Sequence, residues 1–346
     1  MESKIAFFIH FPELVNHYQS TWSALNPARF EIIVGCPTAS ENEFMHGFAR
    51  QRNYSTQSLD AVLSNRQRFK VTVSNHPFAA GHQGGLANLW ELGDIHVRMM
   101  YALGKAQWNF SAWNSQYHIA FCWGRYHEEC LSDFKSLRKI QVGYPRLDSF
   151  YSEPSSKSLL QEKFRLDPDK RTIVWLPTWR ALSSIDDFSP YIKELEKDFN
   201  LLIKVHPNTL TEEPEKIAIL KAHDLEPIAD TYFNNYKLIE LADCVFADYG
   251  GSAFAAIYLN KPVLLLNKHG AESDELTGSQ SLDILLREWL PNISIAQANQ
   301  LNQILREDSV WQPQDAVYQE LRSYLFKETK GKSGEIMAEE LMKLVA

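Results

Sequence analysis

Three short segments in the second half of the chain carry side chains that could together bind a phosphate group. Each combines a charged or hydroxyl-bearing residue with a proline or glycine that bends the backbone. The segments are Pro177-Thr178-Trp179-Arg180, Lys204-Val205-His206-Pro207 and Asp248-Tyr249-Gly250-Gly251-Ser252.

Each segment offers a different contact to an anion. Arg180 carries a planar, permanently charged guanidinium that fits phosphate oxygens, and Lys204 adds a point charge. His206 is a donor that titrates near neutral pH. Gly250-Gly251-Ser252 lets the backbone approach a ligand at the start of a predicted helix, whose unpaired N–H groups favour an anion. Alone, each segment also fits a turn or surface role, but together they favour a phosphate or pyrophosphate site.

Buried strands must position these segments. Short apolar runs at residues 172–176, 201–205 and 244–247 immediately precede or overlap them and predict strands. Ligands of open α/β sheets bind beyond the carboxyl ends of the strands, so the three segments should meet at one edge. Asp248 then fits two roles there: binding a ligand hydroxyl, or capping the helix predicted at residues 252–259.

The same rhythm of strands and helices runs through the whole chain. It predicts α/β domains with parallel sheets covered by helices. The segment 75–114 breaks the rhythm with five glycines and is predicted to be a long functional loop. Helices are expected at residues 126–137 and from Ser189, with Ser189 as N-cap and Pro190 at the first position. The other predicted strands are residues 5–9, 30–34, 69–73, 118–122, 140–142 and 263–266.

A length of 346 residues favours two domains. The polar connector at residues 152–158 places their boundary. The prediction is therefore one Rossmann-like domain over residues 1–151 and a second over residues 152–334. The amphipathic helix at residues 335–346 is a candidate addition to the first domain.

Composition excludes several classes of protein. The formal net charge of −8 and the lack of a long basic run argue against a nucleic-acid partner. The four cysteines are widely spaced, so neither a disulfide framework nor a zinc site is expected, and no cluster with ligand spacing predicts another metal. With no signal-peptide pattern and no apolar run long enough to span a bilayer, the prediction is a cytoplasmic protein.

The second half resembles the CDP-glycerol glycerophosphotransferase family, the teichoic-acid and capsule polymerising enzymes. The family's motifs appear in its order and spacing over roughly residues 95 to 270. They are Pro-Thr-aromatic-Arg at Pro177 to Arg180, Lys-x-His-Pro at Lys204 to Pro207, an Asp-Tyr motif at Asp248 to Gly251 with Lys261-Pro262, and Gly-x-Pro-Arg-x-Asp in the stretch from Val142 to Asp148. The resemblance implies two facing Rossmann-like domains of the glycosyltransferase B type with a deep cleft between them.

The resemblance also implies roles for particular residues. Thr178, Arg180, Lys204 and His206, with Asp248 and Gly250-Gly251-Ser252, would bind the donor and its phosphates in the second domain. The chain departs from the family at Gly250-Gly251, where the family has Ser-Ser, so backbone amides must replace two hydroxyls.

The second departure concerns the base, because the family's N-terminal His-Gly motif is not evident. The corresponding region spans residues 98–105, with Arg98 and Lys105 as candidate acceptor-side residues in the first domain. His96, His82 and His206 are the candidate catalytic residues, and His76 lies near the first two.

The activity implied by the resemblance is transfer of glycerol phosphate, or a related polyol or sugar phosphate, from a CDP-activated donor to a hydroxyl of a glycan or lipid-linked acceptor. No cofactor is implied, since the nucleotide-activated donor is a substrate. A lipid-linked acceptor would bring the protein to the inner face of the membrane. The alternatives are a nucleotide-sugar glycosyltransferase, a nucleotide-sugar 2-epimerase, or a non-catalytic relative that binds nucleotide or glycan.

Overall fold

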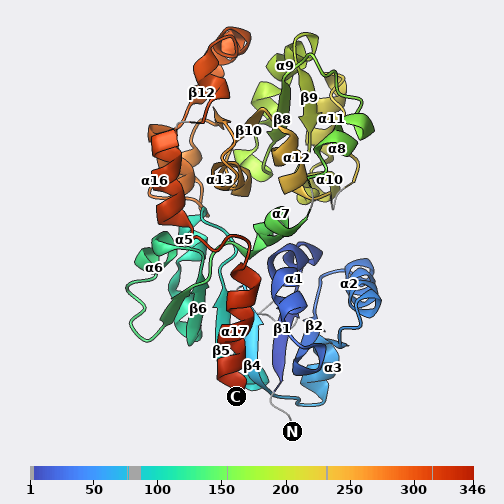
Figure 1. Cartoon of the computed structure of the whole chain (residues 1–346), viewed down its shortest axis with the longest axis vertical. Coiled ribbons are helices and arrows are strands. Elements are labelled where there is room, and N and C mark those ends of the chain that lie inside the picture. Colours follow the sequence, from blue (N-terminus) through green and yellow to red (C-terminus); the bar gives the residue numbers. More distant parts are fainter. Residues whose placement is uncertain (1–3, 76, 78–86, 154, 231–232, 314) are drawn as a thin grey trace. The chain divides into compact units, whose positions relative to one another are not determined.

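The chain forms two α/β units, each built on its own parallel sheet (Figure 1). The computed structural model describes residues 4–346 except 76, 78–86, 154, 231–232 and 314. Unit 1 comprises residues 1–101, 110–153 and 323–346, and unit 2 comprises residues 102–109 and 154–322. This division differs from the predicted domains in three places: residues 102–109 group with unit 2, and residues 152–153 and 323–334 group with unit 1. The α/β class with parallel sheets is confirmed.

Over its described residues, the sheet of unit 1 has seven strands in the order β3-β2-β1-β4-β5-β6-β7, and every neighbouring pair is parallel. Its central strands are apolar and buried because helices cover both faces of a parallel sheet. The strands are β1 (Ile5–Ile9), β2 (Phe30–Val34), β3 (Thr56–Ser58), β4 (Phe69–Ser74), β5 (Gly93–Met99), β6 (Ile119–Cys122) and β7 (Arg138–Gln141).

A group of aromatic rings lies within the hydrophobic core of unit 1. The ring of Phe7 on β1 makes edge contacts with Tyr18 and Trp22, at centroid distances of 5.5 and 5.9 Å. Both partners come from α1 (Val15–Ala24). The other helices of this unit are α2 (Ala39–Gln51), α3 (Leu59–Ser64), α4 (Ala87–Leu92), α6 (Arg125–Cys130), α7 (Asp148–Ser152) and α17 (Ser333–Val345).

The last helix of the chain completes this core. Met337 and Leu341 of α17 are fully buried in the cluster that contains Phe7, and Figure 1 shows α17 running beside β4. Asp148 fixes the start of α17, since its carboxylate accepts the N–H groups of Ser333 at 3.1 Å and Gly334 at 2.6 Å. The motif that ends in Asp148 is therefore an anchor for α17.

In the part of unit 2 that the structure describes, the sheet has five parallel strands in the order β12-β11-β10-β8-β9. Its central strands β8 and β10 are buried along their whole length. The strands are β8 (Thr172–Leu176), β9 (Asn200–Ile203), β10 (Cys244–Ala247), β11 (Val263–Asn267) and β12 (Asn292–Ser294). The helices are α5 (Ala106–Asn109), α8 (Lys157–Lys163), α9 (Ile185–Glu194), α10 (Pro207–Glu212), α11 (Pro214–Ala222), α12 (Asn235–Leu241), α13 (Gly251–Tyr258), α14 (Leu282–Leu285), α15 (Leu301–Ile304) and α16 (Asp315–Leu325), which continues into unit 1.

Two of the predicted helix boundaries are wrong. α9 begins at Ile185 with Ser184 as its N-cap, and Pro190 lies inside the helix. The earlier start is favoured because Ile185 and Phe188 are buried in the core of unit 2. The helix predicted at residues 126–137 ends at Cys130, where turns follow.

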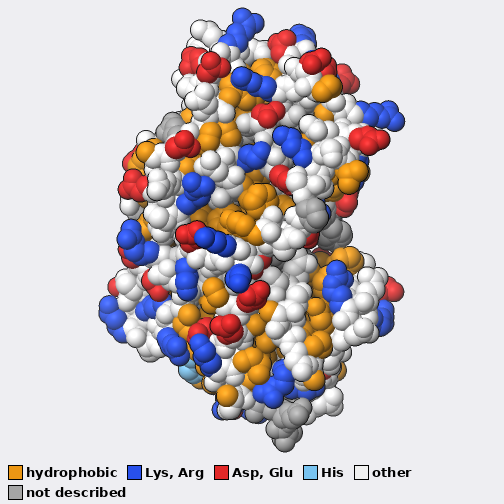
Figure 2. All heavy atoms as spheres, in the orientation of Figure 1, with side chains coloured by type: hydrophobic (Ala, Val, Ile, Leu, Met, Phe, Trp, Pro, Cys, Tyr) orange, Lys and Arg blue, Asp and Glu red, His pale blue; other side chains and the backbone are white. Residues whose placement is uncertain are grey.

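Charged side chains of both signs are interspersed over the face in Figure 2. None of the helices within the described ranges is both long and apolar enough to cross a membrane.

Candidate functional site

The three predicted segments of unit 2 lie at the same edge of its sheet. They follow β8, β9 and β10, and β8 pairs in parallel with each of the other two. We call this set the strand-end cluster: Thr178, Trp179, Arg180, Lys204, His206, Asp248 and Gly250 to Ser252. A parallel sheet brings such segments together because all of its strands end on one side.

Arg180 lies exposed at the tip of the segment that follows β8. Its backbone has a left-handed φ of 59°, and its N–H donates to a carboxylate oxygen of Glu213 at 2.8 Å. Its guanidinium carbon lies 4.1 Å from the ring centroid of Trp179. Trp179 stacks in turn on His206, with 5.3 Å between the ring centroids and 10° between the planes. A guanidinium and an imidazole thus both contact one indole ring.

The hydrogen bond at His206 fixes its tautomer. His206 is the N-cap of α10, and its Nδ1 accepts the N–H of Asn208 at 3.2 Å. The neutral imidazole therefore carries its proton on Nε2, which is the donor that a phosphate oxygen needs. Lys204, two residues earlier, is buried at the end of β9.

Asp248 is engaged by the protein itself. Its carboxylate accepts the N–H groups of Thr178, Ser184 and Tyr249, each at 2.8 Å, and the Ser184 hydroxyl at 2.9 Å. Burial raises its pKa to about 6, against the opposing effect of hydrogen bonds from Ser184 and Thr178. The predicted role of Asp248 as the cap of the following helix is wrong, because α13 has Gly250 as its N-cap and no side-chain cap hydrogen bond. The contacts of Asp248 instead join the segments after β8 and β10 to the start of α9. Its binding of a ligand hydroxyl stays a prediction.

The helix start after β10 is open on one side. Gly250 has a φ of 155°, which favours glycine, and a Cβ added there would approach the Thr178 hydroxyl at 3.5 Å. A Cβ added to Gly251, the first residue of α13, would meet no atom within 4 Å. The N–H groups of the first turn, including that of Ser252, have no partner within the helix by geometry. This end of α13 can therefore receive an anion.

Lys105 groups with the strand-end cluster of unit 2 rather than with the first domain. Its N–H donates to Asp283 at 2.7 Å, and its ammonium lies 6.0 Å from the Trp179 ring centroid. Burial lowers its pKa, and the nearby Asp283 partly offsets this effect. Gly104 permits the contact, since a Cβ there would come within 2.0 Å of the Asp283 carboxylate.

The candidates in β5 of unit 1 are enclosed by their neighbours. His96 is fully buried, its Nδ1 lies 2.7 Å from the Thr72 hydroxyl, and burial lowers its pKa to about 4. Arg98 is also fully buried; it donates to the Asn75 carbonyl and the Asn114 side chain and lies over Trp113. His76 and His82 lie outside the described residues. The roles predicted for these residues stay predictions.

A group that sequence reasoning missed lies at the strand ends of unit 1. His17 of α1 packs between Tyr101, which follows β5, and Trp123, which follows β6, at centroid distances of 5.6 and 6.3 Å. Burial, with a smaller effect of Arg146, holds the pKa of His17 well below its ordinary value. A signal was present, since His17 lies three residues after Leu14, on the apolar face of its helix.

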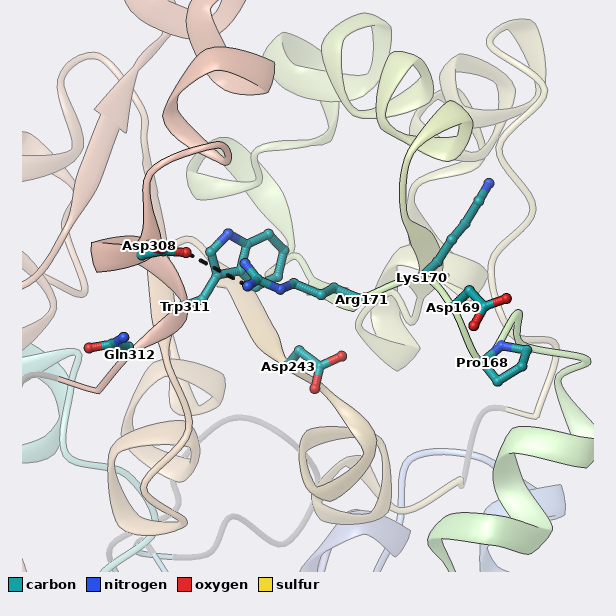
Figure 3. A pocket seen from close by; sticks show the side chains of 8 residues that line it. All are labelled: Pro168, Asp169, Lys170, Arg171, Asp243, Asp308, Trp311 and Gln312. Atoms are coloured by element: carbon teal, nitrogen blue, oxygen red, sulfur yellow. Dashed lines mark ion pairs between the residues drawn. The ribbon is translucent and has the colours of Figure 1, made fainter.

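A pocket of about 470 Å³ lies at the opposite edge of the unit 2 sheet (Figure 3). Arg171 and Asp243, which line it, directly precede β8 and β10. The guanidinium carbon of Arg171 lies 4.7 Å from the ring centroid of Trp311. A guanidinium nitrogen pairs with a carboxylate oxygen of Asp308 at 3.8 Å. These ring and charge contacts are internal to the pocket wall and separate from the strand-end cluster.

Within the described part of the chain, His, Cys, Asp and Glu side chains form no group of three or more that could hold a metal ion. The charged groups of the strand-end cluster are instead mainly cationic donors. The arrangement can bind a phosphate or pyrophosphate group through Arg180, His206 and the start of α13.

Comparison with known proteins points to one family. The sequence model of the CDP-Glycerol:Poly(glycerophosphate) glycerophosphotransferase family matches residues 106–343. The teichoic acid glycerol-phosphate primase of Bacillus spizizenii is 28% identical over 140 residues, which are 38% of this chain and 34% of that protein. The teichoic acid poly(glycerol phosphate) polymerase of Staphylococcus epidermidis is 24% identical over 270 residues, 71% of this chain and 35% of that protein. In these matches the chain spans about a third of the length of each relative.

Among solved structures, the wall teichoic acid polymerase TagF has a similar fold. The comparison gives a TM-score of 0.67 at 15% identity and covers all of this chain and 89% of that chain. At this identity the similarity concerns the fold alone, which agrees with the glycosyltransferase B type expected from the motifs.

Proposed function

Because the chain belongs to the CDP-Glycerol:Poly(glycerophosphate) glycerophosphotransferase family, we propose that it transfers glycerol phosphate from CDP-glycerol to an acceptor hydroxyl. The acceptor would be a glycan or a lipid-linked glycan in the synthesis of a cell-surface polymer such as teichoic acid or capsule. A lipid-linked acceptor would also bring the protein into peripheral contact with the membrane.

The observation that carries the proposal is the strand-end cluster. Arg180, His206 and the open start of α13 occupy the ends of three adjacent parallel strands. Together they present a guanidinium fork, an imidazole N–H and backbone amides, which suit the oxygens of a pyrophosphate. Lys105 adds an ammonium group beside Trp179.

The chemistry follows from these donors. The acceptor oxygen attacks the phosphorus that carries glycerol, and the bond from this phosphorus to the bridging oxygen breaks. The electron pair of the broken bond leaves with CMP, and the acceptor proton passes to a base. Negative charge grows on the bridging and equatorial oxygens, where Arg180 and His206 stabilise it by preorganised electrostatics.

The test is release of CMP from purified CDP-glycerol in the presence of acceptor. We expect Arg180→Ala and His206→Ala each to lower kcat/KM by about 100-fold or more, as losses of preorganised donors do. Arg171→Ala is the matched control, because Arg171 also lies over a tryptophan but at the opposite end of β8. Its kcat/KM should stay near the wild-type value.

Two other outcomes would replace the proposal. Release of UDP from a nucleotide sugar, with no CMP from CDP-glycerol, would assign the chain to the nucleotide-sugar enzymes. Thermal stabilisation by nucleotides without turnover of any donor would make it a binding protein. Sedimentation with vesicles that carry a lipid-linked acceptor, compared with vesicles that lack it, tests the membrane contact.

A further inference from the structure

Glu213 lies at the junction of two motifs of the strand-end cluster, although it belongs to neither. It stands between α10 and α11, and only 8% of its surface is exposed. One carboxylate oxygen accepts the N–H of Arg180 at 2.8 Å, and the other accepts the hydroxyl of Thr209 at 2.8 Å. Thr209 lies on α10, which His206 caps, so one side chain joins the segments that follow β8 and β9.

The bond to Arg180 is made through the main chain at a position that needs support. Arg180 has a φ of 59°, a left-handed conformation that non-glycine residues rarely adopt without stabilising contacts. Since Glu213 holds the N–H, the side chain of Arg180 keeps its place over Trp179. The Glu213 carboxylate also pairs with the ammonium of Lys216 at 3.8 Å. The same ammonium pairs more closely with Asp186, at 2.9 Å.

We propose that Glu213 is a positioning residue for donor binding. It holds Arg180 and the His206 segment in the relative arrangement that a pyrophosphate requires. This inference rests on the proposed function, since Arg180 must be a donor ligand for its position to matter. Preorganised groups lose most of their effect when they move by about 1 Å, so loss of Glu213 should weaken the reaction strongly.

The experiment is a double-mutant cycle with Arg180, measured as kcat/KM for CMP release from CDP-glycerol. In the wild-type background, Glu213→Ala should lower kcat/KM by about 10-fold to 100-fold. In the Arg180→Ala background, the same change should lower it by less than about 3-fold, because the group it positions is gone. Glu213→Gln keeps one carbonyl oxygen for the Arg180 N–H and should recover part of the loss.

Controls separate this role from a general effect on folding. Glu212→Ala, which removes an exposed carboxylate one residue earlier, should leave kcat/KM near wild type. If Glu213→Ala does not fold, Thr209→Val removes the hydroxyl that holds the other carboxylate oxygen. It should show a smaller loss with the same dependence on Arg180.

Three results would overturn the inference. If the wild type is active and the kcat/KM of Glu213→Ala lies within about 2-fold of it, the positioning role of Glu213 is rejected and the proposed function stands. An equal loss in both Arg180 backgrounds would show that Glu213 acts on the fold and not through Arg180. A wild type that releases no CMP from CDP-glycerol would reject the proposed function and this inference with it.

Discussion

The carboxylate of Asp248 accepts the N–H of Thr178 at 2.8 Å and so ties the end of β10 to the segment that follows β8. Ser184 donates to the same carboxylate from the N-terminus of α9. Asp248 is buried, so each of these bonds forms away from water and is stronger than a surface bond. One buried side chain therefore holds the segment after β8, the end of β10 and the start of α9 together.

This arrangement predicts a pH-dependent stability. Burial raises the pKa of Asp248 from 3.8 to about 6. Between these pH values the folded state therefore holds a proton on Asp248 that the unfolded state has released. The contribution of this proton to the free energy of unfolding is fully present below about pH 4 and is lost as the pH rises through 6. The loss is about 3 kcal/mol at most. Urea unfolding at several pH values should show this loss in wild type and not in Asp248→Asn.

The matched control is Asp243→Asn, which changes a carboxylate at the opposite edge of the same sheet. It should keep the wild-type dependence between pH 4 and 6. If the Asp248 variant also keeps it, the pKa of Asp248 is not raised and the prediction is wrong.

The ring of Trp179 should matter for donor affinity. It stacks on His206 and lies under the Arg180 guanidinium, contacts that contribute about 0.5–1 kcal/mol each. Trp179→Ala should raise KM for CDP-glycerol by about 5-fold to 10-fold, and Trp179→Phe by less. Steady-state kinetics of the three proteins measure this, and an alanine variant equal to wild type contradicts it.

The two glycines at the start of α13 should respond differently to serine. Gly251→Ser fits open space and adds a hydroxyl near the helix N-terminus, so KM for the donor should fall about 2-fold to 5-fold. Gly250→Ser places a side chain at a φ of 155° and should cost about 1–3 kcal/mol of stability. Melting temperature and KM together test the pair. If both variants change KM and the melting temperature equally, the difference in backbone conformation between Gly250 and Gly251 is unimportant.

Asp148 should stabilise unit 1 without affecting the response of the protein to CDP-glycerol. Asp148→Ala leaves two buried N–H groups at the start of α17 unpaired, which costs about 1–3 kcal/mol. The unfolding transition of unit 1 should move down by several degrees, while stabilisation by CDP-glycerol stays. The exposed Asp133→Ala serves as control. A lost response to CDP-glycerol would mean that Asp148 acts on the donor site.

The strands that carry the strand-end cluster could be predicted because their residues are almost all apolar. The runs at β8 and β10 fix where each strand ends, and parallel pairing then places the following segments together. The sequence was thus sufficient to group Arg180 with His206.

β5 was missed because its polar residues looked like part of a loop. Asp94, His96 and Arg98 alternate with apolar residues in Gly93–Met99, within a glycine-rich region. Arg98 can be buried only because Asn75, Asn114 and Trp113 surround it. Such partners come from the tertiary structure and have no local signal.

The place of Lys105 could not be predicted for a similar reason. Its backbone is held by Asp283, which lies 178 residues later, and by the absence of a side chain at Gly104. Glu213 was missed because it lies outside every recognisable motif and acts on the main chain of Arg180. Every residue except proline has a backbone N–H, so a contact to this group does not restrict the residue type and cannot be predicted from the sequence.

The anchoring of α17 has a consequence for the order of folding during synthesis. Met337 and Leu341 complete a core whose first residues, such as Ile5 and Phe7, leave the ribosome more than three hundred residues earlier. Unit 2 is translated entirely between these parts. Unit 1 must therefore wait, with part of its sheet surface uncovered, until unit 2 has emerged and can fold. A nascent chain stopped before Ser333 should expose this surface to chaperones, whereas the full chain conceals it.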